Sequence, residues 1–188
     1  MKKLLCIAPH LSTGGLPQYL TKKVELIKDE IEVYLVEWDN LTGGVLVVQK
    51  DRLQSMIPPE RFFVLGEDKN ELFDIIDQIQ PDIIHLEEIP EYFMDFDIAK
   101  KLYSQDRSYS LIETSHDSSM DTNNKTFFPD KFIFVSEWQK EQYKNINVPQ
   151  EVIYYPIEYK ERPNREEALN SLGLDPNKKH VLHVGLFT

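Results

Sequence analysis

Short apolar runs alternate along the chain with longer stretches in which apolar residues recur at helical spacing. The short runs, rich in β-branched and aromatic residues, predict buried strands, and the longer stretches predict amphipathic helices. We expect strands at Lys3–Ala8, Glu32–Trp38, Arg61–Leu65, Asp82–Leu86, Tyr109–Thr114, Lys131–Val135 and Glu151–Tyr154. We expect helices at Leu16–Lys28, Asn70–Gln80, Asp97–Tyr103 and Glu137–Lys144. This alternation predicts an α/β fold with a Rossmann-like, doubly wound, mostly parallel sheet.

The first predicted helix has an apolar face and a polar face. Leu16, Leu20, Val24 and Ile27 recur at helical spacing and should pack on the sheet. The same spacing places Thr21, Lys22, Lys23 and Lys28 outward.

The last part of the chain has a different character. A charged link with a proline, Lys160–Arg165, precedes a short predicted helix at Glu166–Leu172, with Gly173 in the C-cap position. A final apolar run, His180–Leu186, predicts a strand. We therefore expect one domain over residues 1–160, and a link, short helix and first strand of another domain over residues 161–188.

Composition narrows the function classes. The chain has 188 residues, 21 basic and 32 acidic, and a net charge of -11. This balance argues against a general nucleic-acid binder, which needs clustered cations. No apolar run reaches the roughly 20 residues of a transmembrane helix, and the apolar stretch at the amino terminus is too short for a signal peptide. The single cysteine, Cys6, excludes an internal disulfide, so we expect a soluble protein of the reducing cytoplasm.

Parallel sheets bind ligands at the carboxyl ends of their strands, so residues just after each strand are the candidates. Gly14 and Gly15 follow the first strand and open a helix, where free N–H groups would let a phosphate or sugar approach; a tight turn is the alternative. His116 follows a later strand and suits acid–base work or hydrogen bonding to a phosphate; a loop histidine capped by neighbouring hydroxyls is the alternative. Asp117 could orient His116 or serve as a turn residue.

Weaker candidates follow two other strands. Glu87 and Glu88 could bind sugar hydroxyls or a cation, although neighbours on a continuing strand point to opposite sides. Ser136 is predicted to be a helix N-cap. His85, within a strand, is predicted to be a core or edge residue whose hydrogen bonds are satisfied by the protein. The chain has no dinucleotide-binding G-x-G-x-x-G, no Walker loop and no nucleophile elbow, and its Asp95-Phe96-Asp97 triplet arises readily by chance in so acidic a chain.

Taken in order, several segments resemble the amino-terminal half of a GT-B glycosyltransferase of the family 4 type. The segments are STGGLPQYL (12–20), PDIIH (81–85), ETSHD (113–117), FVSEW (134–138) and VIYYPIE (152–158), and residues 165–185 resemble the link into the second domain of that family. The resemblance implies two Rossmann-like domains facing across a cleft. The amino-terminal domain would hold a sugar-containing acceptor and the other a nucleotide-sugar donor, and transfer would proceed with retention and without a metal or other cofactor.

Carried over by position, the resemblance assigns roles to the candidate residues. Gly14 and Gly15 would approach the diphosphate or sugar of the donor, and His116 would be the catalytic residue beside the reacting sugar. Glu87 and Ser136 would line the cleft, with Asp117 as a further substrate contact. The chain departs from the family where Glu87 and Glu88 stand in place of the usual His or Asn.

Half a cleft should not support transfer, so we expect the isolated chain to be inactive and to bind nucleotide-sugar weakly. The final strand, with open edges, should pack on the sheet of its own domain or form a homodimer with a second copy. Two other hypotheses for the function stay open. One is a stand-alone Rossmann-type module that binds a sugar or phosphate without catalysis. The other is a small hydrolase or epimerase, which the absence of a nucleophile elbow and of a dinucleotide-binding loop disfavours.

Overall fold

The computed structural model describes residues 1–40, 48–117, 120–157 and 159–183, which fall into two compact units, Met1–Pro156 and Ile157–Thr188. The described part of the first unit contains seven strands, each within a few residues of its expected position. They are β1 (Lys3–Ala8), β2 (Glu32–Glu37), β3 (Phe62–Val64), β4 (Ile83–Leu86), β5 (Ser110–Ser115), β6 (Lys131–Phe134) and β7 (Gln150–Val152).

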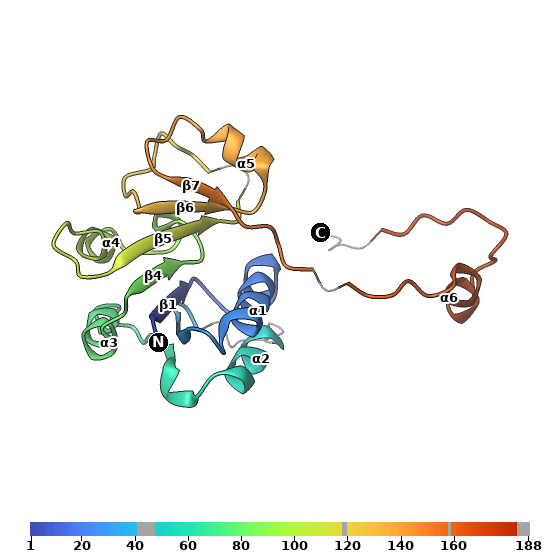
Figure 1. The fold of residues 1–188 in the computed structure, drawn as a ribbon, viewed down its shortest axis with the longest axis horizontal. Coiled ribbons are helices and arrows are strands. Elements are labelled where there is room, and N and C mark those ends of the chain that lie inside the picture. Colours follow the sequence, from blue (N-terminus) through green and yellow to red (C-terminus); the bar gives the residue numbers. More distant parts are fainter. Residues whose placement is uncertain (41–47, 118–119, 158, 184–188) are drawn as a thin grey trace. The chain divides into compact units, whose positions relative to one another are not determined.

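All seven strands form one parallel sheet in the order β3-β2-β1-β4-β5-β6-β7 (Figure 1). The order reverses direction at β1, whose neighbours are β2 and β4, so this point is the topological switch point of the sheet. The predicted fold class, a Rossmann-like doubly wound sheet, is confirmed. The carboxyl ends of β1, β4 and β5 therefore lie next to one another at one edge.

Five helices accompany the sheet within the described part of this unit. They are α1 (Gly15–Ile27), α2 (Val48–Met56), α3 (Glu71–Ile79), α4 (Phe96–Leu102) and α5 (Glu137–Gln142), with 3-10 turns at Pro59–Arg61 and Pro90–Tyr92. Helix α2 was not expected from the sequence, which showed only a short apolar run at 45–48. Val48 opens this helix, and residues 45–47 lie outside the described residues. Because Leu53 is its one buried residue, α2 has no apolar periodicity to reveal it.

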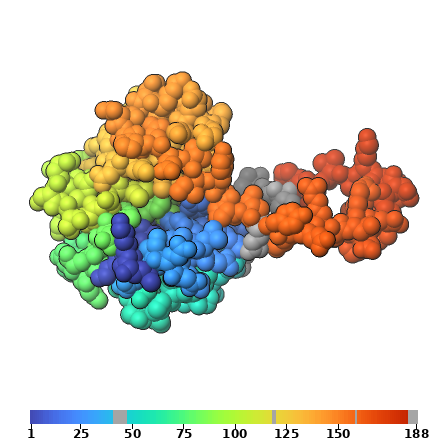
Figure 2. Space-filling model, viewed as in Figure 1, coloured from blue at the N-terminus to red at the C-terminus, as the bar shows by residue number. Residues whose placement is uncertain are grey.

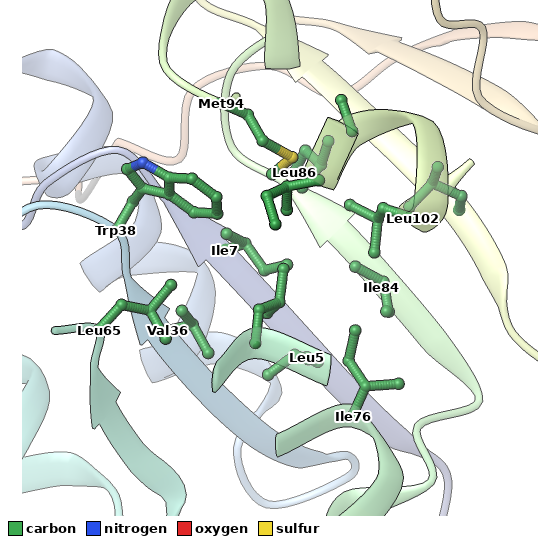
Figure 3. Close-up of a cluster of buried hydrophobic side chains, with 14 of the residues drawn as sticks. Leu5, Ile7, Val36, Trp38, Leu65, Ile76, Ile84, Leu86, Met94 and Leu102 are labelled. Atoms are coloured by element: carbon green, nitrogen blue, oxygen red, sulfur yellow. The ribbon is translucent and has the colours of Figure 1, made fainter. Parts of the chain in front are cut away.

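Strand β1 is buried on both sides, as its unbroken apolar run predicts. On one face, Leu5 and Ile7 join a cluster with side chains of α3 and α4 (Figure 3). On the other face, Leu4 and Cys6 pack with α1 and α2, whose light-blue and cyan atoms lie against each other in Figure 2. The two clusters fix the helices that carry the loops at the carboxyl edge.

The second unit contains one described helix, α6 (Arg165–Ser171). The Asn164 side chain caps its start by accepting from Glu166 N at 2.9 Å. Gly173, with φ 69°, ends it in a Schellman arrangement in which Leu174 N donates to the Leu169 carbonyl at 2.9 Å. The C-cap glycine predicted from the sequence is confirmed.

The expected strand at His180–Leu186 is not formed at residues 180–183, and residues 184–186 lie outside the described residues. Val181 and Leu182 are 98% and 86% exposed. An apolar run becomes a strand only when another strand accepts its backbone hydrogen bonds, and no described segment pairs with this one. The homodimer stays a prediction. None of the described helices has the length and apolar character needed to cross a bilayer.

Candidate functional site

The turn from β1 into α1 brings a glycine pair to the carboxyl edge of the sheet. Gly14 has φ 128° and ψ -178°, a backbone conformation that side chains of L-residues rarely adopt. Gly15, the first residue of α1, is exposed, and a Cβ added there would meet nothing within 4 Å. Among the described residues, no side chain caps this helix, so the N–H groups of its first turn can serve a ligand.

The loop between β1 and this turn is held in place from β2. Leu11 N donates to Oε1 of Glu37 at 2.9 Å, and Lys50 of α2 donates to Oε2 of the same carboxylate at 2.5 Å. Glu37 is 1% exposed. The backbone at Leu11, three residues before the glycine turn, is therefore held to β2.

His116 lies just beyond β5, two strands from β1 in the sheet. Its ring packs edge-on against Tyr19 of α1, with ring centroids 5.0 Å apart. Its Nε2 atom is buried and has no hydrogen-bond partner among the described residues. Burial lowers the pKa of the imidazole, so the ring is neutral near pH 7, and within the described chain its Nε2 atom lacks the partner that a buried polar atom ordinarily has.

Tyr19 connects the glycine turn with His116. Its ring lies 5.2 Å from that of Tyr155, which follows β7, and the Tyr155 hydroxyl donates to the carbonyl oxygen of Gly15. Gly15, Tyr155, Tyr19 and His116 thus form one contiguous set of contacts. The structure brings together the sequence candidates from β1 and β5.

Glu87 requires a correction. It was expected to line the cleft, but its side chain is fully buried and forms an ion pair with Lys23 of α1. Burial alone would raise the pKa of Glu87, yet the Lys23 ammonium holds it at about 2. Lys23, expected to face outward, instead turns inward to this carboxylate, because a buried carboxylate needs a counter-ion. Thr21 also turns inward and donates its hydroxyl to the Pro17 carbonyl at 2.7 Å.

His85 is a satisfied core residue, as expected. Its Nδ1 atom lies 3.1 Å from Nζ of Lys23, and its Nε2 atom lies 2.7 Å from the hydroxyl of Thr114. Burial, reinforced by the Lys23 charge, lowers its pKa to about 3, so the ring is neutral. Lys23, Glu87 and His85 together form a polar group between α1 and β4, and Lys23 and His85 also line a neighbouring pocket with Tyr19 and Tyr154.

Glu88 turns away from Glu87, as expected for neighbours at a strand end. Its Oε1 atom accepts from Ile89 N at 3.0 Å, and its Oε2 atom accepts from His116 N at 3.2 Å. Burial raises the pKa of this carboxyl group to about 7. The sequence analysis assigned Glu87 and not Glu88 to the cleft, because adjacency shows that the two diverge but not toward which partners.

Ser136 caps α5, as predicted, by accepting from Gln139 N at 3.1 Å. Gln139 is buried and its amide donates to the carbonyl oxygens of Ser115 and Asp117, at 3.1 and 2.9 Å. The Asp117 carboxylate accepts from the Tyr92 hydroxyl at 3.4 Å. Asp117 thus occupies a turn held by Gln139, and Ser136 lies at the start of the helix that holds it.

The sequence contained one signal for the residues that were missed. Tyr19 and Lys23 follow the predicted Gly15 at intervals of four, which places all three on one face of α1. Gln139 gave no signal, because a buried glutamine in a short helix looks like a surface one. Within the described residues, no cluster of three or more His, Cys, Asp or Glu side chains is arranged to hold a metal ion.

No protein-family model matches this chain, and no curated protein matches it. Among solved structures, it is similar to Anabaena HepE in complex with UDP, with a TM-score of 0.60, 14% identity, and coverage of 92% of this chain and 50% of HepE. The HepE complex with UDP-glucose gives a TM-score of 0.59 at 16% identity with the same coverage. The chain thus spans about half the length of HepE. At this identity the likeness shows the fold alone, and it confirms the Rossmann-like architecture predicted from the sequence.

Proposed function

We propose that this chain is the acceptor-side, amino-terminal domain of a GT-B glycosyltransferase of the family 4 type, which moves a sugar from a nucleotide-sugar to a sugar-containing acceptor. The observation that carries the proposal is the convergence of the Gly14–Gly15 turn and His116 on Tyr19 at the switch point of the sheet. The fold likeness to HepE, solved with UDP-glucose, adds support.

Each site residue is assigned a role in binding from its chemistry. The open amino terminus of α1 offers N–H donors and the positive end of the helix dipole to the donor diphosphate or sugar. His116, neutral and with Nε2 unpartnered among the described residues, holds a hydroxyl of the reacting sugar. Asp117 and Ser136, near the same edge, contact the acceptor. Glu87 has no part in binding because Lys23 already neutralises it.

Residues 161–188 are proposed to be the link and the beginning of the donor-binding domain. Transfer with retention needs the leaving diphosphate stabilised by positive charge or backbone donors, and donor and acceptor held in register. The glycine turn supplies only part of the first requirement. We infer that the chain by itself binds nucleotide-sugar weakly and does not transfer the sugar.

Amide chemical shifts test this function. We expect UDP-glucose to perturb Gly15 and His116 in the 188-residue chain with a dissociation constant of about 1 mM or weaker, as suits half a cleft. In His116→Ala the perturbation at Gly15 should weaken, whereas His180→Ala, which alters an exposed histidine of the second unit, should match the unmodified chain. Perturbation confined to residues away from the carboxyl edge would reject the proposal.

The affinity separates this function from the stand-alone binding module. A complete module would saturate at micromolar ligand, roughly 4 kcal/mol tighter than the millimolar binding expected of half a site. Saturation of this chain by micromolar UDP-glucose or phosphate, without turnover, would favour the module.

A further inference from the structure

Glu88 joins the ends of two neighbouring strands. β4 and β5 pair in register, with Leu86 opposite Glu113, and Glu88 lies two residues beyond that last pair. Its carboxylate then accepts two backbone N–H groups, one from Ile89 on its own side and one from His116 on the other. The carboxylate therefore links the segments that follow β4 and β5, beyond the last hydrogen bonds between the two strands.

The His116 contact fixes the direction in which the chain leaves β5. An N–H group beyond the end of the ladder needs an acceptor, and Glu88, 9% exposed, supplies one from within the protein. With the backbone held there, the His116 ring lies edge-on against Tyr19. Loss of the acceptor would leave the His116 N–H without this hydrogen bond, while Gln139 would still hold the carbonyls on either side of it and Tyr19 would still contact the ring.

We propose that Glu88 is the positioning residue for His116: its carboxylate, by holding the His116 backbone N–H, aims the imidazole into the sugar site. The role of the imidazole rests on the proposed function. The coupling between the two residues does not, and it can be measured without any transfer reaction.

The surroundings of Glu88 make the coupling sensitive to pH. The groups that face it are Asp117 and His116 from the turn after β5, the Ser115 hydroxyl, and the Tyr92 phenol from the Pro90–Tyr92 turn. Burial, with the Asp117 charge adding to it, raises the pKa of the carboxyl group to about 7. A protonated carboxyl is a weaker acceptor than a carboxylate, so the hold on His116 should weaken as pH falls through neutrality.

The test is a pH titration of the His116 backbone amide by nuclear magnetic resonance, in the 188-residue chain. We expect a titration with a midpoint near pH 7. In Glu88→Gln this titration should vanish, and hydrogen exchange at His116 should become at least about tenfold faster. Glu137→Gln, an exposed acid of α5, serves as the matched control and should leave both measurements unchanged.

Two further measurements keep the proposal falsifiable. Asp117→Asn should shift the midpoint without abolishing the titration, and the His116 ring, followed at its own carbon resonances, should titrate at lower pH than the amide. If Glu88→Gln does not fold, the proposal is still tested by the titration of the His116 amide in the unmodified chain and by its shift in Asp117→Asn. A His116 amide that does not respond between pH 5 and 9 overturns the proposal, as does a response that survives in Glu88→Gln. Failure of UDP-glucose to perturb Gly15 would instead count against the proposed function alone.

Discussion

The hydroxyl of Tyr155, three residues beyond the end of β7, donates to the carbonyl oxygen of Gly15, the first residue of α1. The two residues are 140 positions apart in the sequence. The bond ties the last part of the first unit to the glycine turn, and the Tyr155 ring also packs on Tyr19. The glycine turn is therefore held both by its own helix and by the segment that leaves the sheet.

Tyr155→Phe tests this tie because it removes the hydroxyl and keeps the ring. We expect the free energy of unfolding to fall by about 1 kcal/mol, the usual net value of one hydrogen bond. Amide exchange in the first turn of α1 should become faster, while exchange in α3 stays the same. Tyr154→Phe, which alters an exposed neighbour, is the control. Equal amide exchange rates at Gly15 in both variants would show that the Tyr155 hydrogen bond does not stabilise the glycine turn.

Lys23→Met removes the counter-ion of a fully buried carboxylate and should destabilise the chain by about 3–5 kcal/mol. Lys22→Met, which breaks a partly exposed pair with Glu25, should cost less than about 1 kcal/mol. Urea unfolding measures both. The double variant Lys23→Met/Glu87→Leu should recover most of the loss, because no uncompensated charge then stays buried. A double variant as unstable as the single one would contradict this account.

The same pair sets a limit on stability in acid. The pKa of Glu87 is about 2 in the folded chain, below its ordinary value of 4.5. Its contribution to stability is therefore present above about pH 4.5 and is lost as pH falls toward 2. In the double variant Lys23→Met/Glu87→Leu this part of the acid dependence should be absent. A pH–stability curve between pH 2 and 6, unchanged by the substitutions, would show that another carboxylate dominates.

Alanine substitutions at the two glycines should have different effects. Gly14→Ala places a Cβ on a backbone with φ 128° and should cost about 1–3 kcal/mol. Gly15→Ala puts its Cβ into open space at the start of a helix and should leave the melting temperature within a few degrees. We expect Gly15→Ala nevertheless to lose the response to UDP-glucose, because the new methyl group occupies the approach to the first-turn N–H groups. Retained binding by a folded Gly15→Ala would place the ligand elsewhere.

His116→Ala should affect function far more than stability. The ring contributes one edge-on contact with Tyr19, and its Nε2 atom has no partner among the described residues, so truncation should cost about 1 kcal/mol. Calorimetry gives the stability, and sugar transfer is measured in a form of the protein that shows turnover, where a drop of about a hundredfold is expected. Loss of folding in His116→Ala would make the histidine structural.

The strands were predictable because a parallel strand buried on both faces is mostly apolar, as β1 is from Leu4 to Ala8. The glycine turn, His116 and the Ser136 cap were predictable because they follow strands directly. Lys23 was not, since its partner lies 64 residues away and helical spacing alone places a lysine outward. The run at His180–Leu186 shows the opposite error. Apolar composition favours a strand, but a strand also needs a neighbour, and composition does not report one.

The placement of β1 between β2 and β4 has a consequence for how the chain folds. β1 pairs with β2 across one helix, but Lys3 meets Asp82 only across a separation of 79 residues. During synthesis the first strand leaves the ribosome well before its second partner exists, and contacts of such long range are slow to form. Until β4 arrives, β1, which is buried from Leu4 to Ala8 in the folded chain, has an open edge. During that interval the unpaired edge of β1 could be bound by a chaperone or by a second nascent chain.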